Sequence, residues 1–160
     1  QVENCLFKLP RHYFEQSEAF EGMFALPPTD IQEGTSNENP IRLEGTKSWD
    51  FAAFLKVIYD RENGGVRDLD SITLQELLAA LELAHKWGFK KVLQRAIKAT
   101  EEFSMDEVER IRITHKYGIN EWAGPTYEKL LLRENPLTAD EMGSLGLEFS
   151  SKMWAARERL

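Results

Sequence analysis

The most reactive side chains in this sequence are His12, His85, His115 and Cys5. A metal site needs several His, Cys, Asp or Glu ligands at short fixed spacings, and no histidine here combines a second ligand at i+3 or i+4 with a matching partner motif. Cysteine catalysis needs an activated thiolate, yet Cys5 has only Lys8 as a cation nearby in sequence and no accompanying His and Asn pair. We therefore expect no metal ion, no cofactor and no catalytic residue.

Glycines and paired carboxylates, which build phosphate loops and acid-base sites, also give no catalytic pattern. The run Asn63-Gly64-Gly65 is followed by neither Gly-Lys-Ser nor a dinucleotide fingerprint, so it predicts a turn. Neighbouring acids such as Glu101-Glu102 and Asp106-Glu107 are common in a chain this acidic, and a solvated or capping role explains them. A hydrolase built from scattered carboxylates is therefore the weakest of the alternatives.

The charge balance points to protein partners. Twenty Lys and Arg against 27 Asp and Glu give a net charge of −7, whereas nucleic-acid-binding surfaces are normally basic. The basic spacing Lys91, Arg95, Lys98 has no interleaved aromatics and predicts the water-facing side of a helix. No apolar run approaches a membrane span, and a single cysteine fits a reducing compartment. We expect an intracellular protein of the cytoplasm or nucleus that binds neither nucleic acid nor membrane.

The elements that carry these residues are mostly helices. Phe51, Phe54 and Ile58 have helical spacing behind Ser48, a candidate N-cap. Three further starts have the S/T-x-x-E form of a capping box, namely Thr73 with Glu76, Ser104 with Glu107, and Thr138 with Glu141. The repeated form His-Lys-aromatic-Gly-apolar predicts helix ends at Gly88 and Gly118. Asn120 is a candidate cap for a helix in which Gly124-Pro125 causes a kink or a late start, and Phe149, Met153 and Trp154 mark the last helix.

The first 48 residues predict a small amount of sheet. Val2 to Leu9 suggests a strand end, a tight turn near Glu3 and a second strand, and residues 41–43 could add one more. The first arm of this hairpin is very short, so we expect that the chain was cut from a longer protein. Arg11 to Phe24 has a helical pattern that breaks near Ser17. Residues 26–40 and 60–71 have the composition of loops.

Several aromatic residues could serve either a core or an interface. Trp87 and Trp122 lie among apolar neighbours, which favours core packing, and we place Leu78 on the buried face of its helix. Phe20, Met23 and Phe24 follow the hairpin closely, and for them packing and binding are equally open.

The order of these elements resembles the BTB/POZ domain, in its large fungal branch. The resemblance rests on LFKLPRHYFEQSEAFEGMFALP, IRLEG, SWDFAAFLKVIYDR and TLQELLAALELAHKWGFKKVLQRAIK, which span nearly all of residues 2–103. It implies an α+β, predominantly helical fold in which helices flank a small sheet of short strands, with most of the first strand missing. We therefore expect a BTB/POZ domain at residues 1–103 and a C-terminal helical extension at residues 104–160.

The resemblance also implies a function, a non-enzymatic interaction module. Family members self-associate through the first helix pair, and some act as adaptors that dock a cullin-type ubiquitin ligase scaffold. The step Leu74-Gln75-Glu76 has the apolar-x-acidic form associated with that docking. A helical scaffold fragment of a transcriptional regulator is the alternative. The interface residues that follow from the resemblance are Tyr13, Phe14, Phe20, Met23, Phe24, Leu74 and Glu76.

Overall fold

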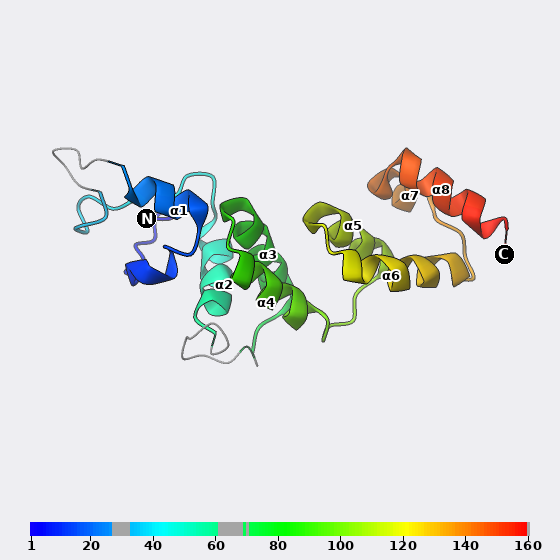
Figure 1. Ribbon diagram of the computed structural model, residues 1–160, viewed down its shortest axis with the longest axis horizontal. Coiled ribbons are helices and arrows are strands. Elements are labelled where there is room, and N and C mark those ends of the chain that lie inside the picture. The colour runs from blue at the N-terminus through cyan, green and yellow to red at the C-terminus, as the bar shows by residue number, and fades with distance from the viewer. Residues whose placement is uncertain (27–32, 61–68, 70, 160) are drawn as a thin grey trace. The chain divides into compact units, whose positions relative to one another are not determined.

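The computed structural model describes residues 1–26, 33–60, 69 and 71–159. Within these residues the chain forms eight α-helices and one short 3₁₀ helix, so the expectation of a predominantly helical protein is confirmed. The chain divides into two compact units, Gln1–Phe103 and Ser104–Leu160, which Figure 1 colours from blue to green and from yellow-green to red. The expected Asn63-Gly64-Gly65 turn lies outside the described residues.

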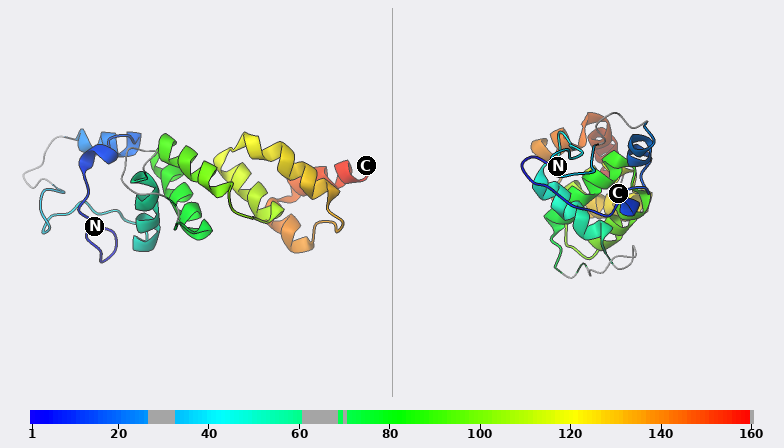
Figure 2. Two further views of the ribbon diagram at one scale, coloured as in Figure 1. Left: turned by 90° about the horizontal axis from the view of Figure 1, so that it is seen from below. Right: turned by 90° about the vertical axis from the view of Figure 1, so that its left-hand side faces the viewer.

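The N-terminal unit is a set of helices gathered around α3. Its elements are the 3₁₀ helix η1 (Arg11–Tyr13), α1 (Glu18–Phe24), α2 (Ser48–Ile58), α3 (Leu74–Trp87) and α4 (Lys90–Thr100). Helix α3 packs against both α2 and α4, and Figure 2 shows the neighbouring green helices of this unit. The expected break of the first helical stretch near Ser17 is confirmed, because η1 and α1 are separate.

The small sheet is not shown. The β-type pairing whose two partners both lie in the described part of the chain is an isolated antiparallel bridge, in which Val2 and Cys5 exchange two N–H to carbonyl bonds of 3.0 Å around a tight turn. Residues 6–9, expected as a strand, have no assigned partner. Alternating apolar residues fit a strand, but a strand needs a neighbouring backbone to accept and donate its hydrogen bonds.

Residues 41–43 approach the start of the chain without forming a ladder. The backbone N–H of Leu43 donates to the carbonyl of Gln1 at 2.9 Å, and the terminal ammonium group of Gln1 donates to the carbonyl of Ile41. A single residue is therefore held beside this segment, whereas a ladder needs successive pairs. In place of the expected additional strand, the structure has these two hydrogen bonds to Gln1.

Two of the three expected capping boxes are confirmed. The hydroxyl of Thr73 accepts the N–H of Glu76 at 3.3 Å, and the Glu76 carboxylate accepts the N–H of Thr73 at 2.9 Å. Thr138 and Glu141 make the same exchange at 3.2 and 2.6 Å. Each box satisfies two backbone donors that the first turn of a helix leaves open.

The third expected box, at Ser104, is wrong. Helix α5 (Glu107–Tyr117) is capped by Asp106, whose carboxylate accepts the N–H groups of Val108 at 2.9 Å and Glu109 at 3.3 Å. A carboxylate is a strong cap and also favours the positive end of the helix dipole. Asp106 therefore fixes the start two residues later than the Ser104 pattern indicated.

The expectation that Ser48 is the N-cap of α2 is wrong, because Ser48 is the first residue of the helix. Its backbone N–H and its hydroxyl both donate to one carboxylate oxygen of Glu3, at 2.8 and 2.7 Å. Glu3 has a φ of +50°, in the left-handed region that non-glycine residues seldom adopt. The cap of α2 thus comes from a turn 45 residues earlier in the chain.

The expected helix ends at Gly88 and Gly118 are confirmed. Both residues have positive φ angles, +73° and +65°, which glycine adopts at little cost. The residue after each glycine donates its N–H back to the last turn, with Phe89 bonding the Ala84 carbonyl at 2.8 Å. Such a bond satisfies a carbonyl that the helix end leaves open, and it turns the chain sharply into the next helix.

The C-terminal unit is a second group of helices with its own core. It contains α5, α6 (Asn120–Leu132), α7 (Ala139–Leu145) and α8 (Leu147–Arg157). Val108, Ile111, Leu130 and Met153 form its buried cluster. Helix α6 begins at Asn120 itself and runs through Pro125, so neither Asn120 as the cap nor a late start is correct.

Burial corrects two expectations in the N-terminal unit. Leu78 is half-buried, while Leu77 and Leu81 have no exposed surface, so the buried face of α3 is rotated from the expected one. Arg95 was expected on the water-facing side of its helix with Lys91 and Lys98. Its guanidinium instead pairs at 2.7 Å with Asp60, a side chain that is only 2% exposed. Trp87 and Trp122 are buried as expected.

The position of Leu81 makes a prediction for stability. We expect Leu81→Ala to lower the free energy of unfolding by about 2–5 kcal/mol, because a cavity remains in a site without exposed surface. Leu78→Ala, in the same helix but half-buried, is the matched control and should cost clearly less. Urea denaturation followed by tryptophan fluorescence measures both, and equal losses would contradict the assigned face.

Candidate protein interface

Helix α1 is fixed to the end of α3 by one serine. Ser17 is fully buried, and its hydroxyl oxygen accepts the N–H of Phe20 at 3.4 Å as the N-cap of α1. The same hydroxyl donates to the carbonyl of Trp87, the last residue of α3. One side chain therefore satisfies a donor at the start of one helix and an acceptor at the end of another.

An aromatic core lies beneath this contact. It consists of Phe14, Phe20, Phe51, Phe54, Trp87 and Phe89. The ring of Phe20 lies 5.4 Å from that of Trp87 at 88°, an edge-to-face arrangement, and 5.1 Å from that of Phe14. Phe14 and Phe20 were expected in an interface, but they are only 5% and 7% exposed. They support the surface above them and do not form it.

The outer part of α1 leaves apolar side chains in contact with water. Met23 and Phe24 are half-buried, and Leu26, just after the helix, is 69% exposed. The guanidinium of Arg11 lies 4.2 Å from the centre of the Phe24 ring, a cation–π contact. We call Arg11, Met23, Phe24 and Leu26 the α1 surface. It contains two of the residues expected from the sequence.

Tyr13 belongs to a different neighbourhood. Its ring packs edge-to-face on Tyr59, the residue that ends α2, with 4.6 Å between centres. The Tyr59 hydroxyl is buried and has no hydrogen-bond partner among the described residues. Burial, followed by the effect of Tyr13, raises the pKa of Tyr59 above its usual value.

Leu74 and Glu76 stand at the other end of α3. Trp87 lies thirteen positions after Leu74, which corresponds to roughly 20 Å along the helix axis, so these residues and the α1 surface are separate sites. The Glu76 carboxylate accepts a hydrogen bond from Lys56 at 2.6 Å besides capping α3. Lys56 first, and then the backbone of Thr73, lower the pKa of Glu76.

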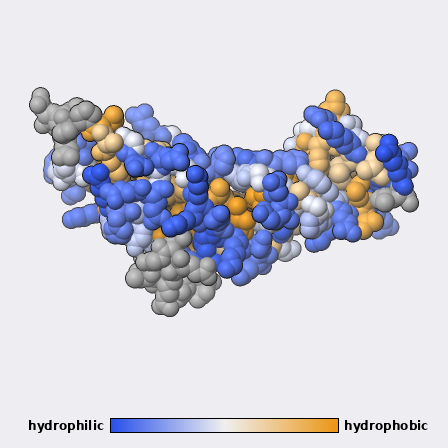
Figure 3. Space-filling view, in the orientation of Figure 1, coloured by the Kyte–Doolittle hydropathy of each residue, from blue (hydrophilic) through white to orange (hydrophobic). Residues whose placement is uncertain are grey.

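A second apolar surface, in the C-terminal unit, was missed by the sequence reasoning. Leu132 at the end of α6 is 68% exposed, and Leu147 and Trp154 on α8 are 85% and 51% exposed. Figure 3 shows hydrophobic residues gathered over this unit. The signal was present in the sequence, because α8 has apolar residues on two faces: Phe149 and Met153 pack on the core, and Leu147 and Trp154 do not.

A shallow hollow lies beside this surface, with a volume of about 290 Å³ that includes its open mouth. Its lining comes from α6, the following loop and α8, and consists of Leu130, Leu131, Pro136, Leu137, Met153, Trp154 and Arg157. The exposed Trp154 and the cationic Arg157 are therefore parts of one recess.

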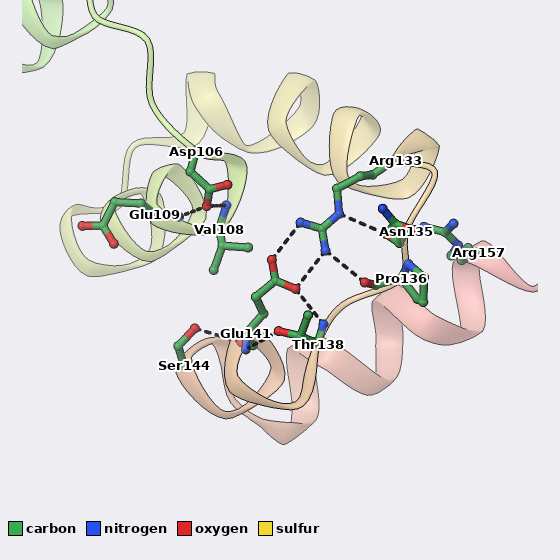
Figure 4. A network of polar contacts seen from close by, with 10 residues as sticks. All are labelled: Asp106, Val108, Glu109, Arg133, Asn135, Pro136, Thr138, Glu141, Ser144 and Arg157. Atoms are coloured by element: carbon green, nitrogen blue, oxygen red, sulfur yellow. Dashed lines mark hydrogen bonds and ion pairs between the residues drawn. The ribbon is translucent and has the colours of Figure 1, made fainter.

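Two arginines hold the loop between α6 and α7 (Figure 4). Arg133 makes a two-pronged ion pair with Glu141, at 2.8 and 2.9 Å, and also donates to the carbonyls of Asn135 and Pro136. Arg157 donates to the carbonyl of Glu134 at 2.7 Å. These five bonds end on the carbonyls of residues 134–136 or on the Glu141 carboxylate. They therefore hold the wall of the hollow in a fixed shape.

This network strongly affects the acid at its centre. The hydrogen bonds from Arg133, and after them the backbone N–H of Thr138, lower the pKa of Glu141 from 4.5 to about 2. They stabilise the charged form of the carboxyl group, and the reciprocal effect raises the pKa of Arg133.

Comparisons with known proteins do not add a family. The chain matches no protein-family model, no curated protein and no solved structure. In the ranges that the structure describes, no helix is both long and apolar enough to cross a membrane. No three His, Cys, Asp or Glu residues in those ranges group as ligands for a metal ion.

The double role of Ser17 predicts a measurable loss of stability. We expect Ser17→Ala to lower the free energy of unfolding by about 1–3 kcal/mol, because it removes a cap and leaves the buried Trp87 carbonyl without its partner. Ser151→Ala removes an exposed hydroxyl bonded to the Glu148 carbonyl and should stay within about 0.5 kcal/mol. Denaturation curves compare the two, and similar effects would contradict the assigned role.

The lowered pKa of Glu141 predicts a pH dependence. A carboxyl whose folded-state pKa lies below its unfolded value contributes stability above the unfolded pKa, and that stability is lost as pH falls through the folded value. The difference in unfolding midpoint between the wild type and Glu141→Gln should therefore be full above pH 4.5 and shrink as pH falls towards about 2. Glu128→Gln, an exposed control in α6, should show no such trend.

Proposed function

We propose that this chain is a non-enzymatic protein-interaction module that self-associates through the α1 surface. The observation that carries the proposal is the exposure of Met23, Phe24 and Leu26 on a helix whose position is already fixed. Apolar area that folding leaves exposed is available for burial against another protein, at roughly 25 cal/mol per Å².

The contacts that fix α1 lower the entropy cost of binding a partner. Phe20 fills the aromatic core, and the Ser17 hydroxyl joins the helix to Trp87, so α1 does not have to become ordered when a partner arrives. A surface already in its bound conformation loses less conformational entropy on association. Arg11, stacked on Phe24, adds a side-chain type that is enriched at the centres of interfaces.

The BTB/POZ assignment of residues 1–103 is part of this proposal. The succession of η1, α1 and α2, followed by the α3–α4 hairpin, supports it. Docking of a cullin-type scaffold at the start of α3 stays a prediction, in which half-buried Leu74 would make the contact. The Glu76 carboxylate is already bonded within the chain, to Lys56 and to the backbone N–H of Thr73. The role of a transcriptional-regulator fragment also stays a prediction.

The test is the molar mass of the chain in solution across a wide range of concentrations. We expect the wild type to dimerise and Leu26→Glu to weaken the dimer by tenfold or more, because a charge would be buried in an apolar contact. Leu6→Glu is the matched control, since Leu6 is also exposed, at 55%, but lies outside the α1 surface. It should leave the dimer unchanged.

Two results would contradict the proposal. One is a wild-type chain that stays monomeric at the highest concentration it tolerates. The other is an equal weakening by Leu26→Glu and Leu6→Glu, which would place the contact elsewhere.

A further inference from the structure

We propose that the C-terminal unit docks an amphipathic helix of a partner protein, with the apolar face of that helix on α8 and a carboxylate on Arg157. The site, which we call the α8 groove, consists of Leu147 and the hollow lined by Trp154 and Arg157. It lies in a different unit from the α1 surface and does not depend on self-association.

The spacing along α8 fits a helical partner. Leu147 and Trp154 are seven residues apart, which places them on one face, two turns and roughly 10 Å from each other. They are 85% and 51% exposed, while Met153, the residue before Trp154, is buried in the core. An amphipathic helix presents apolar side chains at this same two-turn interval.

The size of the hollow argues for a side chain as its occupant. The enclosed space of the hollow is only about 20 Å³, far below the roughly 300–1,000 Å³ of pockets that enclose whole small molecules, and the lining from α6 and the loop is aliphatic. So shallow a recess receives the tip of one apolar side chain of a partner helix beside Trp154, a residue type that frequently anchors interfaces.

Charge complementarity specifies the second feature of the partner. The Arg157 guanidinium donates to the carbonyls of Glu134 and Asn135, at 2.7 and 3.4 Å. These bonds hold its position and leave other donors of the group open. Among the described residues, no carboxylate forms an ion pair with Arg157. A cation held at the edge of an apolar recess favours an acidic group on the occupant.

The nearby charges do not compete for that carboxylate. Lys152, on the same helix, is already paired with Glu148 at 2.6 Å. Arg133 is paired with Glu141 in the network that holds the loop. Arg157 is therefore the cation of this recess that a partner carboxylate would meet.

The test uses two synthetic amphipathic helical peptides of about 20 residues, a length at which isolated helices begin to form. Both carry leucine at i, i+3, i+4 and i+7. One has glutamates flanking the apolar face, and the other has lysines there. Fluorescence anisotropy of the labelled peptides measures binding to the full chain, and circular dichroism checks the fold of each variant.

We expect the glutamate peptide to bind more tightly than the lysine peptide. Trp154→Ala should weaken binding by about tenfold or more, and Arg157→Gln should remove the preference between the peptides. Lys152→Gln, a control on the same helix, should change neither value. Leu26→Glu should bind as the wild type does, which separates this inference from the proposed function.

Four outcomes would overturn the inference. Neither peptide binds saturably, or the lysine peptide binds as well as the glutamate peptide, or Trp154→Ala has no more effect than Lys152→Gln. Self-association that Trp154→Ala abolishes would assign the groove to a second copy of this chain, and it would equally overturn the docking of a separate partner.

Discussion

The N-terminal unit depends on the hydrogen bonds of one buried hydroxyl group, that of Ser17. A capping aspartate could accept the Phe20 N–H but could not donate to the Trp87 carbonyl, whereas a hydroxyl does both. The carbonyl is open to this bond because α3 ends there, at the left-handed turn of Gly88. The Ser17 hydroxyl thus satisfies both the open carbonyl at the end of α3 and the open N–H at the start of α1. The aromatic rings pack around this contact.

The two units position their exposed apolar residues by different physical means. In the N-terminal unit, edge-to-face rings such as Phe20 and Trp87 fix α1, and the α1 surface is the remainder of a large aromatic core. In the C-terminal unit, charged hydrogen bonds from Arg133 and Arg157 fix a loop, and aliphatic side chains line the recess beside it. The aromatic packing is insensitive to salt and pH, whereas the charged hydrogen bonds depend on ionised groups.

The local signals in the sequence predicted the helices well. A threonine with glutamate three residues later, or a glycine after a basic last turn, acts within one turn of backbone, so the sequence alone contains the whole interaction. One failure was local, at Ser104, where Asp106 caps the helix instead. Others involve distant partners. Ser48 is bonded by Glu3, and Arg95 by Asp60, from 45 and 35 residues away. The expected strands also lacked a partner, which no alternation of residues can supply.

The candidate interface was only partly predictable for a similar reason. Phe20 and Phe24 share one short helix and one residue type, and only the position of α3 makes the first a core residue and leaves the second at the surface. Trp154 was understood from the sequence as one more residue of the last helix. Exposure depends on how the whole chain packs. The spacing of apolar residues therefore identifies candidate interface residues but cannot separate those in the core from those at the surface.

The bonds that hold the first residues of the chain also have a consequence for the order of folding. Glu3 meets Ser48 across 45 residues, and Ser17 meets Trp87 across 70, whereas the α3–α4 and α5–α6 pairs join neighbouring segments. Closing long loops costs entropy before any contact repays it, so the helical hairpins should assemble first. The segment that carries the α1 surface would then dock last onto a preformed α3 and be the first to detach when the native state fluctuates.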